Sequence, residues 1–115
     1  MKSDLAALRH ILQSIERIEA YTTAGKDEFL TQTIVQDAVL RNLEIMGEAT
    51  KRLSPALRAN HPEVPWNEMA ALRDVLAHGY MSVDLEIVWE VIENRLGDLS
   101  RTVSTIKRDV VEKER

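Results

Sequence analysis

The spacing of apolar residues toward the C-terminus constrains the fold of this 115-residue chain more than any other feature. Between residues 85 and 110 they recur at alternating steps of four and three, as Leu85, Trp89, Ile92, Leu96, Leu99, Val103, Ile106 and Val110. Steps of three and four place side chains on one face of an α-helix, and a sustained alternation is typical of a coiled-coil-like seam. The spacing predicts one helix from about residue 83 to residue 110, with a length of about 40 Å.

The rest of the chain also favours helices. Apolar residues follow a helical period over residues 5–22, 27–53 and 65–79, and Ser54-Pro55 predicts the start of a short helix that ends near residue 59. Aromatic residues make up only 4% of the chain, which argues against a β-sandwich. The predicted fold class is all-α, an antiparallel bundle of four main helices that forms a single domain over residues 1–115.

The length of the last predicted helix bears on the oligomeric state. A compact chain of this size has a radius of gyration of about 13 Å, so a helix of about 40 Å would extend beyond a monomeric core and expose its apolar seam. A two-fold homodimer would bury the exposed positions. Alternatively, the long second helix packs alongside the last one within a single chain. We expect the homodimer.

Composition excludes several classes of protein. The chain has no cysteine, which removes disulfides, thiolate metal sites and thiol nucleophiles. No apolar run approaches the roughly 20 residues of a membrane-spanning helix, and the N-terminal residues lack the apolar stretch of a signal peptide. We therefore expect a cytoplasmic protein without a membrane partner. A formal net charge of -4 argues against nucleic-acid binding by overall electrostatics alone.

Residues 73–80, Arg-Asp-Val-Leu-Ala-His-Gly-Tyr, contain the candidate catalytic groups. Cleavage of an RNA phosphodiester without a metal requires a group that moves a proton, and His78 suits this role near neutral pH. It also requires a cation that neutralises the phosphoryl oxygens, which suits the planar guanidinium of Arg73. Asp74 can orient either side chain, and Gly79 is suited to end the helix.

The pair Arg73 and His78 does not by itself establish a catalytic site. Five residues on an ideal helix are about 140° apart, so the two side chains converge only where the backbone leaves the helix or where two protomers face each other. Alternatively, Arg73 forms a surface ion pair and His78 complements the helix dipole. Neither remaining histidine, His10 or His61, has a second histidine three or four residues away, and we predict no metal and no cofactor.

The wider sequence pattern favours the catalytic interpretation of Arg73 and His78. The ordered set of motifs is Gly47-Glu48-Ala49, Pro65-Trp66, Arg73-Asp74-x3-His78-x-Tyr80, Val83-Asp84 and Val88-Trp89. This set resembles the HEPN-domain toxins of the HepT type, which are small all-helical proteins of bacteria and archaea. The resemblance covers nearly the whole chain, and the compound pattern is specific although each piece alone is not.

The resemblance implies a metal-independent ribonuclease toxin whose composite site forms where two protomers face each other. Arg73 and His78 would be the catalytic pair, and Asp74 would orient them. Tyr80 occupies the position that the cognate antitoxin, a minimal nucleotidyltransferase, modifies with AMP. Glu48 matches an acidic supporting position whose role is less settled. The implied partners are an RNA substrate, a second copy of the chain and the antitoxin, with a higher oligomer also open.

Other readings remain open beside this one. The acidic charge favours a non-catalytic helical adaptor that binds substrate for a nucleotidyltransferase, and a plain dimeric structural bundle is a third reading. Residues 51–74 carry a net charge of +1, so a local site for RNA is compatible with the acidic chain. Tyr80 could simply pack with its hydroxyl hydrogen-bonded. We expect Trp66 and Trp89 to be packing anchors, with base stacking by Trp66 as the alternative.

Overall fold

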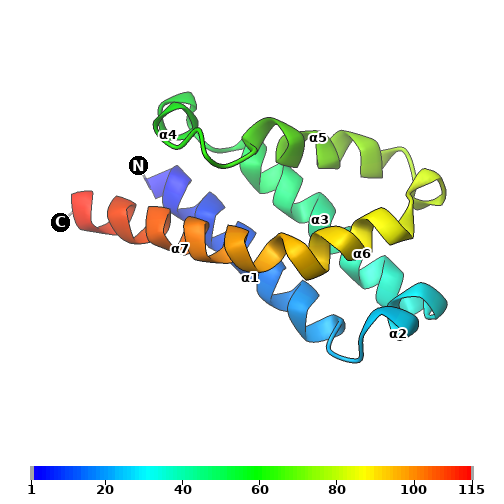
Figure 1. Ribbon diagram of the computed structural model, residues 1–115. Coiled ribbons are helices and arrows are strands. Elements are labelled where there is room, and N and C mark those ends of the chain that lie inside the picture. The colour runs from blue at the N-terminus through cyan, green and yellow to red at the C-terminus, as the bar shows by residue number, and fades with distance from the viewer. Residues whose placement is uncertain (1, 115) are drawn as a thin grey trace.

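The computed structural model describes residues 2–114, and all regular structure within that range is helical (Figure 1). The elements in chain order are α1 (Lys2–Tyr21), α2 (Lys26–Thr31), α3 (Thr33–Lys51), α4 (Pro55–Asn60), α5 (Trp66–Ala77), the 3-10 helix η1 (Tyr80–Ser82), α6 (Leu85–Asn94) and α7 (Leu96–Lys113). The all-α class predicted from the sequence is therefore confirmed.

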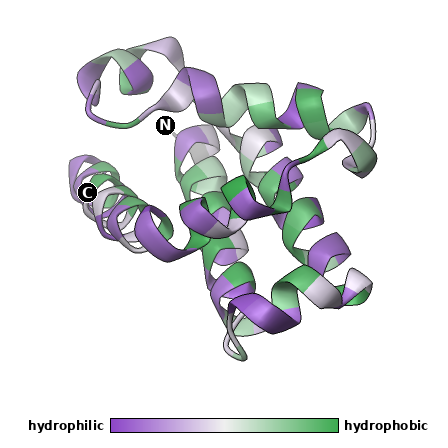
Figure 2. Ribbon diagram, turned by 45° about the vertical axis from the view of Figure 1, so that its right-hand side comes forward, coloured by the Kyte–Doolittle hydropathy of each residue, from purple (hydrophilic) through white to green (hydrophobic). Residues whose placement is uncertain are grey.

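The long helices pack in a chain of pairs. α1 lies against α3, α3 against α5, and α7 against α1, while α6 contacts α2 and continues into α7 (Figure 1). Hydrophobic and hydrophilic residues are interleaved along these helices, as amphipathic packing requires (Figure 2). The centre is filled by fully buried side chains from α1, α2, α3 and α7, among them Leu8, Ile11, Ile15, Ile18, Phe29, Val39, Met46, Leu96, Val103 and Ile106.

The second predicted helix, over residues 27–53, is interrupted. Gln32 has an extended conformation (φ -104°, ψ 105°) and separates α2 from α3. It lies between Thr31 and Thr33, whose β-branched side chains favour helix less than unbranched ones. The hydroxyl of Thr31 donates to the carbonyl of Asp27 at 2.8 Å within the last turn of α2. The single helix expected here is therefore wrong, although its C-terminal end near Lys51 is close to the predicted position.

The last predicted helix is also divided, and this affects the argument for a dimer. α6 begins after Asp84, whose carboxylate accepts from the backbone N–H of Glu86 and Ile87. The helix breaks at Arg95 (φ -123°, ψ -32°), between Asn94 and Gly97, which are poor helix formers. The seam nevertheless continues across the break.

All eight seam residues are buried or half-buried within one chain. The chain accommodates the long element because it is elongated, with extents of 46 × 27 × 20 Å and a radius of gyration of 14.3 Å. The expected exposure of the seam is thus wrong, and α7 is covered mainly by α1 rather than by the second helix. The seam therefore gives no support for a dimer.

A buried hydrogen-bond relay joins the start of α1 to the start of α4. The hydroxyl of Ser54 accepts from the backbone N–H of Leu57, which confirms Ser54 as the N-cap of α4. The carboxylate of Asp4, which is 4% exposed, accepts in turn from the backbone N–H of Ser54 at 2.8 Å and from its hydroxyl at 2.7 Å. These hydrogen bonds hold the start of α4 against the start of α1.

Candidate functional site

The candidate residues lie at the C-terminal end of α5 and in the turn that follows (Figure 1). Arg73 and Asp74 belong to the last turns of α5, His78 caps the helix in αR conformation, and Tyr80 opens η1. Gly79, between His78 and Tyr80, has a φ of +118°, a conformation that residues with a side chain rarely adopt. The predicted helix end next to Gly79 is therefore confirmed, but the expected left-handed cap is not formed, because the ψ of Gly79 is 153°.

One face of α3 supports this segment. Glu44, Gly47, Glu48 and Lys51 are spaced three and four residues apart and therefore share that face. A Cβ added at Gly47 would lie 2.7 Å from the backbone nitrogen of Arg73 and 2.8 Å from the carbonyl oxygen of Met69. Such contacts are too short for any side chain, so glycine is what lets the α5 backbone approach α3 here.

The close approach brings Arg73 to Glu48. The Nε of Arg73 donates to Oε2 of Glu48 at 3.1 Å, and the two side chains are 37% and 49% exposed. Because the bond uses Nε, it involves neither of the terminal nitrogens, Nη1 and Nη2. A guanidinium held in this way can present both terminal nitrogens to a phosphate.

Asp74 forms the next pair along the same two helices. Its carboxylate accepts from the ammonium of Lys51 at 2.7 Å. This hydrogen bond and the charge of Lys51, together with the nearby Arg73 and His78, hold the pKa of the Asp74 carboxyl below its usual value. The side chain of Asp74 is thus engaged by Lys51 rather than by either member of the candidate pair.

His78 contacts Asp74 through the backbone instead. The ring Nδ1 lies 2.6 Å from the carbonyl oxygen of Asp74, one helical turn earlier. A carbonyl oxygen can only accept, so Nδ1 carries the proton and donates it. In the neutral ring Nε2 is then unprotonated and free to take a proton, and His78 is exposed to solvent.

Tyr80 is held by α3 as well. Its hydroxyl donates to Oε1 of Glu44 at 3.2 Å. Burial raises the pKa of the Tyr80 hydroxyl, and the hydrogen bond and negative charge of Glu44 raise it further. Tyr80 is half-buried. The sequence-based alternative for Tyr80, packing with a hydrogen-bonded hydroxyl, is what this structure shows.

The structure gathers all the predicted site residues along one contact between α3 and the segment 73–80. Within residues 2–114 no hydrogen bond or ion pair joins Arg73 directly to His78. Glu48, expected as a supporting acidic residue, is solvent-exposed and pairs with Arg73. Sequence reasoning missed Glu44, Gly47 as a contact position, and Lys51. Their spacing on one helix face was visible, but their partners are 23 to 36 residues away.

The tryptophans and His61 have structural roles. Trp66 is 5% exposed and donates from its indole nitrogen to the carbonyl of His61 at 2.9 Å, so it is a packing anchor and is not placed for base stacking. Trp89 packs against Phe29 with ring centroids 5.7 Å apart. The Nδ1 of His61 lies 3.6 Å from the carboxylate of Glu63.

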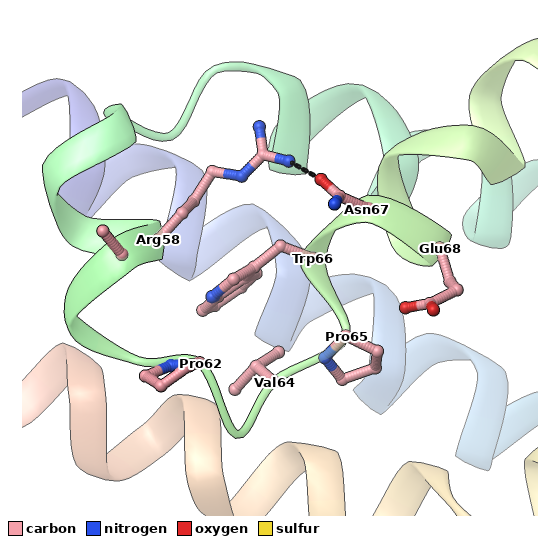
Figure 3. A pocket seen from close by; sticks show the side chains of 8 residues that line it. Arg58, Pro62, Val64, Pro65, Trp66, Asn67 and Glu68 are labelled. Carbon is pink, nitrogen blue, oxygen red and sulfur yellow. Dashed lines mark hydrogen bonds between the residues drawn. The ribbon is translucent and has the colours of Figure 1, made fainter.

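An open hollow of about 410 Å³ lies where the chain passes from α4 into α5 (Figure 3). Arg58 reaches over it and donates to the side-chain oxygen of Asn67 at 2.8 Å, above the ring of Trp66 and the two prolines of the loop. None of the residues 73–80 lines it. In the part of the chain described, no three potential ligands are grouped to hold a metal ion, and no helix is long and apolar enough to cross a membrane.

Comparison with known proteins identifies the family of the chain. Residues 11–106 match the family described as Ribonuclease HepT-like. The match covers most of this all-helical chain, including residues 73–80. The chain belongs to the HepT-like ribonuclease family.

Individual relatives support the family. The chain is 36% identical over 102 residues to "Probable ribonuclease HepT" of Thermococcus cleftensis, covering 88% of this chain and 93% of that protein. It is 36% identical over 116 residues to a "Putative RNase" of Caldanaerobacter subterraneus, with both chains covered in full. A third relative, "Gamma-glutamylcyclotransferase and putative RNase" of Methanocaldococcus jannaschii, is 41% identical over 104 residues. That match covers 90% of this chain but only 47%, about half, of the relative. No solved structure matches the chain.

Proposed function

We propose that the protein is a metal-independent endoribonuclease in which Arg73 and His78 carry out the cleavage. One observation carries this proposal: the Asp74 carbonyl orients His78 and leaves its Nε2 unbound, and five residues earlier Glu48 holds Arg73 through Nε. Both groups sit at the exposed end of α5. A proton acceptor and a fixed cation are the two groups that cleavage needs.

The chemistry follows from these two groups. Nε2 of His78 takes the proton of a ribose 2′-hydroxyl as its oxygen attacks the adjacent phosphorus. The bond from phosphorus to the 5′-oxygen breaks, and that oxygen takes a proton from water or from a second, protonated His78. The products are a 2′,3′-cyclic phosphate and a 5′-hydroxyl. Arg73 contributes by stabilising the charge that develops on the phosphoryl oxygens.

A homodimer completes the proposed site. Val75, within the motif, and Met81, just after it, are 56% and 102% exposed, and Ile87 on α6 is 59% exposed. Exposed apolar side chains around a functional segment are typical of an association surface. A two-fold contact there brings two copies of Arg73 and His78 together, and an assembly with the antitoxin could be larger. Met81→Glu should yield monomers in sedimentation analysis, whereas Ile34→Glu, at another exposed apolar position on α3, should not.

The proposal extends to regulation. We propose that the protein is the toxin of a toxin–antitoxin pair and that a minimal nucleotidyltransferase antitoxin transfers AMP to Tyr80. Tyr80 is two residues from His78, so a nucleotide there adds bulk and negative charge next to the place where the RNA phosphate binds. RNA would be excluded by contact and by repulsion. Because the chain is acidic overall, its affinity for RNA should be modest and only weakly dependent on salt.

The test is cleavage of a labelled RNA in excess chelator. The wild-type protein should cleave, and Arg73→Ala and His78→Ala should each lower the rate by about 100-fold to 10,000-fold, as expected for loss of a charge-stabilising or proton-transfer group. His10→Ala, at an exposed histidine of α1, is the matched control and should cleave normally. Cleavage that persists in His78→Ala, or that requires a metal, contradicts the proposal and favours the non-catalytic adaptor.

A further inference from the structure

The hydrogen bond between Tyr80 and Glu44 is not used by the cleavage reaction. It joins the only tyrosine of the motif to a carboxylate on α3, 36 positions earlier in the chain. We propose that Glu44 is the proton acceptor when the Tyr80 oxygen attacks the α-phosphorus of a nucleoside triphosphate. This inference rests on the proposed function, in which Tyr80 receives AMP.

Tyr80 needs an acceptor because its hydroxyl is a weak nucleophile. A phenol is almost wholly protonated near pH 7, and burial together with Glu44 raises the pKa of Tyr80 above that of free tyrosine. The fraction already ionised is therefore smaller than in an exposed tyrosine. The proton must leave while the new bond forms, and a group in contact with the oxygen has to take it.

Glu44 is the group in contact. Its Oε1 lies 3.2 Å from the Tyr80 oxygen, and its side chain is only 16% exposed, so its position is restricted. Nη1 of Arg41 lies 3.6 Å from the same carboxylate oxygen. The charges of Arg41 and of Asp37, both on the same face of α3 as Glu44, also act on Tyr80, the first lowering and the second raising its pKa.

In the proposed transfer of AMP, one bond forms at the α-phosphorus and one breaks. The Tyr80 oxygen forms a bond to the α-phosphorus, and the bond from that phosphorus to the oxygen bridging to the β-phosphate breaks. Pyrophosphate leaves with the electron pair. The proton of the Tyr80 hydroxyl moves to Oε1 of Glu44, which later releases it to water. The antitoxin supplies the nucleotide, and this chain supplies the nucleophile and its base.

The chain contains an internal comparison. Tyr21, the other tyrosine, is 41% exposed at the end of α1, and in the described part of the chain its hydroxyl binds no carboxylate. If exposure decided which tyrosine reacts, Tyr21 would be the better target. A base at the hydroxyl distinguishes Tyr80 instead.

The experiment measures transfer of AMP from ATP by the nucleotidyltransferase antitoxin, followed by intact mass and peptide mapping. Glu44→Gln keeps the size of the side chain and a hydrogen-bond acceptor but removes the base. At saturating chain concentration its kcat should fall by about 100-fold or more, with little change in KM. Its rate should also rise about tenfold per pH unit as phenolate forms, whereas the wild-type rate should be nearly flat around neutral pH. Glu16→Gln, at an exposed position of α1, is the matched charge control, and thermal unfolding verifies that each variant is folded.

The outcomes separate this inference from the function on which it rests. A slow Glu44→Gln with the altered pH profile supports the role of Glu44. A Glu44→Gln that reacts as fast as wild type, or faster because its Tyr80 ionises more easily, overturns that role and leaves the modification of Tyr80 standing. A wild-type chain modified at Tyr21, or not at all, overturns both, while RNA cleavage is judged independently by the chelator assay.

Discussion

The two sides of α3 hold the molecule together in different ways. One side is apolar and buried, with Val39, Leu43 and Met46 at helical spacing. The other side faces the segment 73–80 and consists of charged residues and a glycine, namely Glu44, Gly47, Glu48 and Lys51. The first stabilises by removing apolar surface from water, and the second positions side chains through exposed ion pairs that add little stability. Stability and site geometry therefore depend on opposite faces of one helix.

Met46→Ala should have the largest effect on stability and no specific effect on cleavage. Met46 is 1% exposed, and truncation of a buried Met to Ala costs about 2–5 kcal/mol through lost burial and the cavity left behind. Chemical denaturation should show this loss. The remaining folded protein should cleave RNA at the normal rate, measured below the new midpoint. A specific defect in kcat would show that the two faces are not independent.

Gly47→Ala should affect both properties, because Gly47 is buried in the contact between α3 and α5. The new Cβ would meet the backbone of Arg73 and of Met69, which cannot move without shifting α5. Overpacking of this kind costs about 1–3 kcal/mol. Cleavage should fall as well, because Arg73 moves away from Glu48. Gly97→Ala is the matched control, since the nearest atom to its added Cβ is 3.6 Å away, at the end of the Arg101 side chain. Equal effects of the two changes would contradict the close-approach argument.

Glu48→Ala should lower cleavage with little change in stability. The ion pair with Arg73 is exposed, so the free energy of unfolding should change by no more than about 0.5 kcal/mol. Without the carboxylate of Glu48 to position the Arg73 side chain, kcat/KM should fall about tenfold. Glu48→Gln, which still offers an oxygen to Nε, should recover most of the rate. Loss of folding in Glu48→Ala would instead assign Glu48 a structural role.

The pair Lys51 and Asp74 should give the smallest effect, and one that depends on pH. Because Lys51 lowers the pKa of Asp74 in the folded chain, the pair stabilises above the unfolded carboxyl pKa of about 4, and this contribution disappears as the pH falls through the lower folded value. Lys51→Met should therefore lower Tm slightly at pH 7 and not at all near pH 2. Asp74→Asn should give the same shift, and the double variant no further one.

The sequence alone determined the helical class and marked the candidate residues of segment 73–80. Helical spacing of apolar residues fixed which segments are helices, because burial on one face imposes a period of three to four residues. The breaks at Gln32 and Arg95 were missed, because the apolar spacing runs through them. The residue types of segment 73–80 marked it as a candidate, but only the wider set of motifs along the chain favoured a catalytic interpretation over an ion pair and a helix-end histidine.

The tertiary structure decided which groups hold those residues. Sequence proximity suggested Asp74 as the partner of Arg73 and His78 and gave no partner for Glu48. In the structure, Glu48 is hydrogen-bonded to Arg73 and Lys51 to Asp74. A backbone carbonyl is hydrogen-bonded to His78, and Glu44 to Tyr80. These partners come from another helix, and they meet because Gly47 lets α5 approach α3. A periodic pattern records which face of a helix is apolar, but it does not record which helix lies across from the polar face.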